Sequence, residues 1–247
     1  MELWTNMHLL TIIPTFIFSI IIAFFSYKYL STKEEKIKYL PLKIIAIIIL
    51  IMELIKQVLS ILKGYNLFHI PLHYCSLFVY ILPLAAFYRG KYRNAVNIFT
   101  ISCCMALSLV MLIFPHSIYS DNCIREFFID FFSFHTITFH SLVCIYFAIM
   151  LTAMDINFDN KKDIKSVSLI LATYLLIPSI VSQILETNFH GMYYCIVDLI
   201  DNMRLFLVEH LYFGGQLIYI LCVMTISIGF TILSYLLARF TYKKIHK

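Results

Sequence analysis

Long apolar stretches separated by short polar ones make up most of the chain. A run of about 20 apolar residues is long enough to cross a bilayer as an α-helix. Seven runs of this kind predict seven transmembrane helices, at 9–30, 44–62, 70–88, 95–114, 131–154, 166–186 and 212–238. We therefore expect an all-α fold, a polytopic membrane bundle that forms one integral membrane domain over residues 1–247.

Composition agrees with this pattern, because 61% of the residues are hydrophobic and only 13% are charged. Soluble domains average about 25% charged residues, so lipid is the expected surrounding of most of this chain. Walker, Rossmann and GxSxG signatures are absent from the sequence. The chain is therefore not expected to be a nucleotide-binding protein or a hydrolase of the GxSxG type.

The basic residues are unevenly shared between the two sides of the predicted bundle. Fifteen of the 19 fall on one side, in and around the first, third and fifth connectors and at the C-terminal end. Since basic loops stay in the cytoplasm, this bias predicts an N-terminus outside and a C-terminus inside. The net charge of +5 is then mostly due to these basic connectors, which set the topology. Membrane lipids are the expected partners, and a nucleic-acid partner is not expected.

Ionisable residues inside the second predicted helix mark a first candidate site. Glu53, Lys56 and Gln57 stand at i, i+3 and i+4 and so share one helical face. One interpretation is a self-neutralising pair that holds two helices together. The other is a face that borders a polar cavity, with Glu53 as a proton acceptor or as the group that orients a histidine.

The stretch "IPLHYCSL" (70–77) brings polar residues into the third predicted helix. If the helix is regular from Pro71 onward, Cys75 and Ser76 lie on one stripe and His73 points away from Cys75. In that geometry His73 does not activate the thiol. Cys75 is then either a buried thiol that packs like alanine or a group facing a cavity.

The fifth predicted helix carries His135 and His140. Counting residues from the expected membrane boundaries places His140 and Cys75 at similar depth in the outer half of the bilayer. An imidazole next to a thiol raises the nucleophilicity of the thiol. The ester carbonyls of phospholipids lie near this depth. A Cys75–His140 pair would suit acyl chemistry.

Metal binding is the competing interpretation of the histidines. The candidate ligands are His73, His135, His140 and His190. Since no HxxxH or HExxH spacing links them, we expect neither a metal nor another cofactor.

The connector 187–211 predicts an interfacial amphipathic segment on the outer side, with Ile196, Leu199, Ile200 and Met203 on one face. Gly214 and Gly215 follow it and suit close helix packing. Cys123 and Cys195 both fall on the outer side. Whether these two thiols form a disulfide is left open by the sequence.

Taken together, three segments resemble the YwaF-like bacterial membrane proteins, a family related to the eukaryotic transmembrane protein 164 family. The first is "IPLHYCSL" (70–77), close to a Leu-Pro-Leu-His-x-Cys-Ser pattern, and the second is "HTITFHSL" (135–142). The second match identifies His140 as the family histidine and puts His135 at a position where relatives carry Gln or another polar residue.

The third segment is "ETNFHGMYYC" (186–195), where Asn188 is the best match to a family asparagine. Glu53 resembles an acidic position on the helix before the Pro-Leu-His motif. The resemblance implies a multi-pass protein of the bacterial cell membrane, with a bundle related to the lipid hydrolases of the androgen-induced gene 1 type. For the eukaryotic relatives it also implies acyl transfer between phospholipids through a cysteine with a histidine partner.

One departure from the family pattern concerns the nucleophile. In the eukaryotic relatives the cysteine directly precedes the motif histidine, a position that Leu72 holds here, whereas this chain has Cys75 two residues after that histidine. On a regular helix, positions 72 and 75 would share a stripe about one turn apart.

Two functions are therefore carried forward. The first is a lipid acyltransferase or hydrolase with Cys75 as nucleophile and His140 as general base. In it His73, His135, Asn188 and Ser76 orient groups or stabilise an oxyanion, and Glu53 tunes a histidine. The second is a non-enzymatic bundle that binds or moves a small solute along the Glu53/Lys56 face. A purely structural role for the polar residues, as contacts between helices, is a third interpretation.

Overall fold

The computed structural model describes residues 4–195 and 197–247. Over these residues the fold is all-α, 79% helical and without strands, as the apolar pattern predicts. Six helical stretches are long and apolar enough to cross a membrane. They make the chain an integral, multi-pass membrane protein.

The six spanning stretches follow the predicted runs closely. They are α1 (Asn6–Phe25) with the π-helical turn η1 (Ser26–Leu30), α2 (Glu35–Lys38) running into α3 (Leu40–Leu62), α5 (Arg93–Ile113), α7 (Phe131–Ala153), α8 (Asn160–Ile184) and α10 (Phe213–Ile245). The remaining helices are α4 (Leu77–Phe87), α6 (Asp121–Arg125), α9 (Asp198–Leu211) and the short 3₁₀ turns η2 (Leu67–His69), η3 (Pro115–Ser117) and η4 (Phe189–Gly191).

The seventh predicted helix, 70–88, is only partly helical. Its helix α4 begins at Leu77, and residues 70–76 form bends and turns instead of a helix from Pro71 onward. Eleven residues rise about 16 Å, roughly half of the hydrocarbon thickness. Non-helical backbone at this depth is stable only where protein or a polar cavity surrounds it.

Side chains of neighbouring helices supply that surrounding. The Tyr174 hydroxyl of α8 donates to the carbonyl of His73 at 3.0 Å, and the Tyr80 hydroxyl donates to the carbonyl of Pro71 at 3.3 Å. The Tyr74 hydroxyl bonds to Thr231 of α10 at 3.3 Å. These tertiary contacts therefore add to the connector's own turn hydrogen bonds, such as that from the Ser76 N–H to the His73 carbonyl at 2.9 Å.

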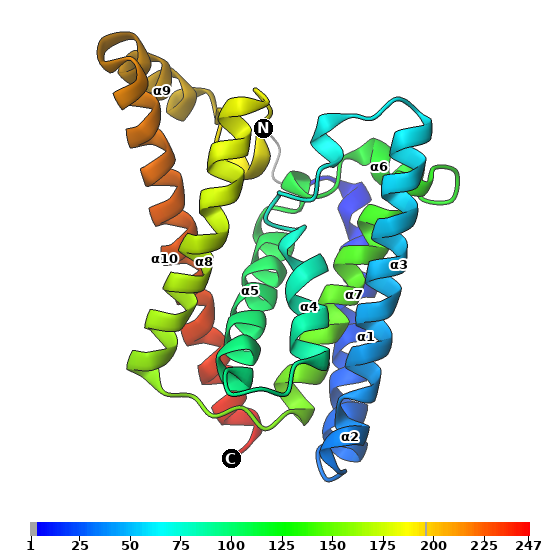
Figure 1. Ribbon diagram of the computed structural model, residues 1–247. Coiled ribbons are helices and arrows are strands. Elements are labelled where there is room, and N and C mark those ends of the chain that lie inside the picture. Colours follow the sequence, from blue (N-terminus) through cyan, green and yellow to red (C-terminus); the bar gives the residue numbers. More distant parts are fainter. Residues whose placement is uncertain (1–3, 196) are drawn as a thin grey trace.

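The helices form two groups that meet at α4 and α5 (Figure 1). One group contains α1, α3 and α7, and the other contains α8, α9 and α10. Among the spanning helices, α5 and α7 are the most buried, while α1 and α10 expose most of their apolar surface. The core lies along α5 and α7, and lipid is the expected surrounding of the exposed faces.

The two ends of the bundle differ in charge. What we call the basic end consists of connectors 31–39, 88–92 and 154–159 and the C-terminal turn, around which 15 of the 19 basic residues gather. What we call the opposite end consists of connectors 63–76, 114–130 and 185–212 (Figure 1).

Helix α9 at the opposite end occupies most of the segment expected to be amphipathic. It has no buried residue, and Leu199, Ile200 and Met203 are exposed. Ile196, the fourth residue of the expected face, lies outside the described residues. The thiols of Cys123 and Cys195 are both free in the structure.

Candidate functional site

A polar cavity of about 320 Å³ opens at the opposite end of the bundle, between α3, α7, η3 and the connector 63–76. It is lined by Glu53, Lys56, Phe68, His69, His73, Cys75, Ser76, Ser117, Ile118, Phe132, His135, Thr136, Phe139 and His140. We call it the polar chamber. It brings together every predicted site residue except Asn188.

His140 offers a free ring nitrogen inside the polar chamber. Its Nδ1 lies 2.6 Å from the carbonyl oxygen of Thr136, one turn earlier on α7. A carbonyl only accepts, so Nδ1 carries the proton and Nε2 keeps its lone pair. Nε2 is buried without a hydrogen-bond partner among the described residues. This tautomer and orientation are those that a general base requires.

The Tyr119 ring helps to hold His140 in this orientation. Its plane meets the imidazole edge-on, with ring centroids 5.6 Å apart, and the tyrosine is fully buried. The Thr136 carbonyl on its own helix and the Tyr119 ring in the connector 114–130 therefore both help to position the His140 ring.

Glu53 connects two basic groups at the chamber wall. Its carboxylate lies 2.8 Å from Lys56 Nζ and 3.2 Å from His135 Nε2, and Gln57 donates to it at 2.7 Å. Glu53 is 6% exposed. The two interpretations of the Glu53 face therefore apply to one cluster. Glu53 and Lys56 form an ion pair, and the same side chains border a polar cavity beside His135.

The irregular backbone of 70–76 changes the expected relation between His73 and Cys75. On a regular helix they would point apart, but here both line the polar chamber together with Ser76. The Ser76 hydroxyl makes no capping bond to α4, so it can serve a ligand. His73 Nε2 lies 3.1 Å from the Phe68 carbonyl and donates to it, which leaves Nδ1 as an acceptor.

A second chamber of about 380 Å³ lies on the other side of Cys75, between η4, α5 and α10. His73, Cys75, Ser117 and Ile118 belong to the walls of both chambers. The remainder of the second lining is mostly apolar or aromatic: Tyr74, Leu107, Val110, His190, Gly191, Ser227 and Phe230. We call this cavity the apolar chamber.

Asn188 is the predicted site residue that the structure keeps away from the polar chamber. Its side-chain oxygen accepts from the backbone N–H groups of Tyr193 and Tyr194, at 3.1 and 3.2 Å. The asparagine therefore orders the loop after α8 instead of facing the chamber. His190, two residues later, bonds through Nε2 to Ser227 at 2.9 Å in the apolar chamber.

Sequence patterns did not indicate three residues near the site: His69, Ser117 and Tyr119. His69 is held by Ser60 at 2.6 Å and by Gln57, which donates to its carbonyl at 2.8 Å. Burial lowers the pKa of His69, so the ring is neutral at pH 7. The sequence feature that comes closest to indicating His69 is the polar face of α3, because Gln57 and Ser60 extend this face toward the opposite end.

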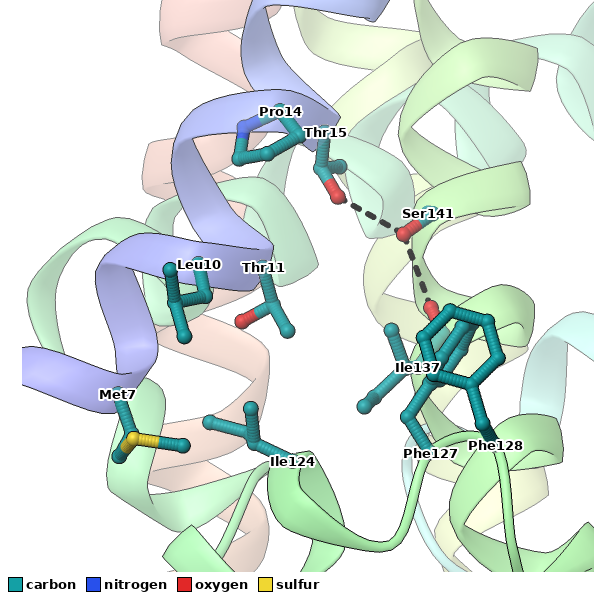
Figure 2. Close-up of a pocket in the computed structure, with 10 residues that line it drawn as sticks. All are labelled: Met7, Leu10, Thr11, Pro14, Thr15, Ile124, Phe127, Phe128, Ile137 and Ser141. Atoms are coloured by element: carbon teal, nitrogen blue, oxygen red, sulfur yellow. Dashed lines mark hydrogen bonds between the residues drawn. The ribbon is translucent and has the colours of Figure 1, made fainter.

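An apolar crevice of about 380 Å³ lies between α1, α6 and α7 (Figure 2). Thr15 and Ser141 bond across it at 2.8 Å, and Ser141 donates to the carbonyl of Ile137 at 2.9 Å. The ten lining side chains are methionine, leucine, isoleucine, phenylalanine, proline, threonine and serine. None of them titrates near neutral pH, so the crevice offers no acid–base chemistry.

Within residues 4–195 and 197–247, the potential metal ligands of the two chambers do not come together in a group of three. Among the described residues, one group of three has ligand atoms within 4.8 Å of one another: His8, His116 and Asp121. His8 Nδ1 already accepts from the Thr5 backbone at 2.9 Å, and Nε2 donates to the Tyr119 carbonyl at 2.8 Å. A metal at this group would have to displace one of these bonds.

Comparison with known proteins agrees with the polar motifs. The family model of the TMEM164 family matches residues 3–237, nearly the whole chain. No curated protein and no solved structure gives a significant match. The narrower YwaF-like grouping, and with it a bacterial cell membrane, stays a prediction. By the extent of the family match, this chain belongs to the TMEM164 family.

Proposed function

We propose that the protein is a membrane-embedded lipid acyltransferase or hydrolase that acts through Cys75 and His140. The observation that carries the proposal is the free Nε2 of His140 in the chamber that Cys75 also lines. A neutral imidazole with an unoccupied lone pair, in one cavity with a thiol, suits a nucleophile and its base.

The two chambers suggest how a lipid ester is held. Cys75 belongs to the walls of both, so an acyl chain in the apolar chamber brings its ester carbonyl to the thiol. The alcohol side of the ester then lies in the polar chamber. Leu72, at the cysteine position of the eukaryotic relatives, is not among the lining residues of either chamber, which favours Cys75 as the nucleophile.

The reaction proceeds in two balanced halves. His140 Nε2 takes the thiol proton, and the thiolate adds to the ester carbonyl. The C–O bond then breaks, the leaving alcohol takes the proton back from His140, and Cys75 carries a thioester. A lyso-lipid alcohol or water gives its proton to His140 and attacks the thioester. The C–S bond then breaks, the new ester or free acid leaves, and His140 returns the proton to the Cys75 sulfur, which restores the thiol.

The neighbouring polar groups have supporting roles in this scheme. The Ser76 hydroxyl is free to donate to the oxyanion. The Glu53 carboxylate lies 3.2 Å from Nε2 of His135 and helps to hold that ring at the chamber wall. His73 donates to the Phe68 carbonyl and so keeps the connector closed around Cys75.

The test uses purified protein in nanodiscs that contain a phospholipid with an isotope-labelled acyl chain and an unlabelled lyso-phospholipid. Mass spectrometry then separates transferred acyl chains from released fatty acid and so distinguishes transferase from hydrolase. In parallel, a lipid-like thiol-reactive probe reports the reactivity of Cys75, with the labelled residue identified by peptide mapping.

We expect Cys75→Ala to abolish turnover and His140→Gln to slow both turnover and labelling of Cys75 by about a hundredfold or more. Cys123→Ala, which removes a thiol at the same end but outside the chambers, should leave both rates unchanged. Equal labelling of Cys75 in the wild type and in folded His140→Gln would contradict the proposal. Loss of solute binding in Glu53→Gln, with Cys75→Ala unaffected, would favour the solute-binding function instead.

A further inference from the structure

A group of three possible metal ligands lies at the opposite end of the bundle, outside both chambers. His8 belongs to α1, His116 belongs to the 3₁₀ turn η3, and Asp121 begins α6. One ligand atom of each residue lies within 4.8 Å of the ligand atoms of the other two. None of the three residues lines the polar chamber or the apolar chamber. We call this group the His–His–Asp cluster.

His8 already has the tautomer of a metal ligand. Its Nε2 donates to the carbonyl oxygen of Tyr119 at 2.8 Å, so Nδ1 keeps its lone pair. A metal-ligating histidine commonly donates its other ring N–H to a carbonyl in this way, which fixes the orientation of the ring. Nδ1 accepts from the Thr5 backbone N–H at 2.9 Å, and this is the bond that a metal would displace. Because Thr5 is only half-buried, water can take over its N–H.

The Thr5 side chain connects His8 to the acid of the cluster. Its hydroxyl oxygen lies 3.1 Å from His8 Nδ1 and donates to Asp121 Oδ1 at 2.7 Å. Asp121 forms no ion pair with a basic side chain in the part of the chain that the structure describes. The negative charge of this carboxylate is therefore available to a cation.

His116 supplies a ring nitrogen without a partner. Its Nδ1 is buried and has no hydrogen-bond partner among the described residues. The ring meets that of His8 edge-on, with centroids 5.8 Å apart. A buried polar atom without a partner costs about 1–3 kcal/mol, and coordination of a metal at this atom would remove the cost. Since either ring nitrogen of a neutral histidine can carry the lone pair, the chemistry of the atom fits a cation.

We propose that the His–His–Asp cluster binds a zinc ion. Two imidazole nitrogens and one carboxylate oxygen suit Zn²⁺, and water or the Thr5 hydroxyl completes the tetrahedron. The ligand atoms of a tetrahedral zinc site are about 3.4 Å apart, so the cluster closes slightly around the ion. His116 and Asp121 are half-buried, which leaves their side chains room to turn toward it.

The ion would fasten α1 to the connector 114–130. Ser117 and Ile118 of this connector line both chambers, and the Tyr119 ring packs against His140. Zinc at the cluster would therefore support the chamber walls from outside, as a structural ion. The proposal does not depend on the reaction proposed above, because metal binding and unfolding are measured without a substrate.

The test uses the full chain in dodecyl maltoside, purified without a polyhistidine tag and stripped of metal with EDTA. Equilibrium dialysis against buffered Zn²⁺, read by inductively coupled plasma mass spectrometry, gives the number of bound ions and their affinity. Co²⁺ is the second probe, because its visible absorption is strong in a tetrahedral site and weak in an octahedral one. His116→Ala and Asp121→Asn are the test variants, and His210→Ala, at an exposed histidine of the same end, is the control.

We expect the wild type to bind one zinc ion whose affinity falls about tenfold or more in both test variants and stays unchanged in His210→Ala. Saturating zinc should raise the midpoint of thermal unfolding of the wild type and of the control, and much less that of the test variants. Tetrahedral Co²⁺ absorption should be lost in the same two variants.

The proposal is overturned if the wild type binds no zinc, or if both test variants bind it as the wild type does, since the ion would then lie elsewhere. It is also overturned if His210→Ala weakens binding as much as they do. Melting curves in EDTA show whether each variant is folded. Asp121→Asn keeps an acceptor for the Thr5 hydroxyl, so it decides the matter if His116→Ala does not fold.

Discussion

Glu53 shows how one buried acid can serve both the structure and the site. It is the common partner of Lys56, Gln57 and His135 in a region where charges are costly. A carboxylate with three partners fixes the positions of the partner side chains as well as its own. Lys56 is in turn 14% exposed at its side chain, so its charge depends on Glu53 for compensation.

We therefore predict that Glu53→Gln destabilises the protein by roughly 3 kcal/mol, because it leaves Lys56 buried and unpaired. For a chain of this size the loss corresponds to about 6–12 °C in the midpoint of thermal unfolding. Differential scanning fluorimetry in detergent measures it. Glu126→Gln, at an exposed acid with no ion pair in the described residues, should change little. The double variant Glu53→Gln/Lys56→Met should recover much of the loss, and a failure to recover would show that His135 is the partner that matters.

Among the elements, the connector 70–76 decides the shape of the site. It places Cys75 between two chambers, and tyrosine hydroxyls of α4 and α8 hold two of its carbonyls. A continuous helix over 70–88 would have satisfied the same backbone groups internally. It would also have directed His73 away from Cys75.

Tyr174→Phe tests this anchor. Loss of one hydrogen bond at 3.0 Å to the His73 carbonyl should cost about 1 kcal/mol and lower the rate of Cys75 labelling. Tyr146→Phe is the matched control, because its hydroxyl donates to the Leu82 carbonyl at the same distance within α4. Both variants should lose similar stability, but only Tyr174→Phe should alter Cys75. A comparable change of labelling in Tyr146→Phe would mean that general loosening of the bundle, rather than the anchor, controls the thiol.

The junction of α9 and α10 depends on a single glycine. A Cβ added at Gly215 would overlap the backbone carbonyl of Leu207, whereas one at Gly214 meets only Leu211 at 3.9 Å. Of the two glycines that the sequence marked for close packing, only Gly215 is therefore required. Gly229, further along α10, has nothing within 4 Å of an added Cβ.

Gly215→Ala should destabilise the protein by about 1–3 kcal/mol, because backbone cannot give way as a flexible side chain can. Gly229→Ala should instead stabilise it by up to about 1 kcal/mol, since alanine favours the helix. Thermal unfolding gives the sign of each change, and limited proteolysis shows whether α9 has separated from α10. Equal effects of the two substitutions on the unfolding temperature would contradict a requirement for glycine at position 215.

For the whole molecule, charge asymmetry predicts how the bundle sits in the membrane. The basic end carries most of the lysines and arginines and should face the cytoplasm, with the chambers of Cys75 opening toward the outer side.

Single cysteines in a cysteine-free background test this orientation. In intact cells a membrane-impermeant maleimide should label Phe128→Cys, at an exposed residue of the opposite end, and should reach Lys161→Cys only after permeabilisation. The reverse pattern would invert the topology. Gel filtration of each variant confirms that it is folded before labelling is compared.

The sequence by itself determined the features that depend on local composition. The length of the apolar runs, compared with the bilayer thickness, predicted six of the spanning helices. The observed stretches begin earlier than predicted at Glu35 and Asn160, and α10 continues beyond its predicted end to Ile245. The cost of polar groups in lipid pointed to Glu53, Cys75 and His140, and the structure brings all three to one chamber.

Only the tertiary structure decided features that depend on contacts between distant segments. The connector 70–76 leaves the helix because residues of α8 and α10 hold its polar groups, and no local pattern contains those partners. Asn188 turns to the backbone of its own loop, while Ser117 reaches the chamber from a connector that folds back onto the bundle. Packing between segments far apart in the chain sets how each helix is rotated and how each loop folds back onto the bundle. The tertiary structure therefore decided which residues line the polar chamber.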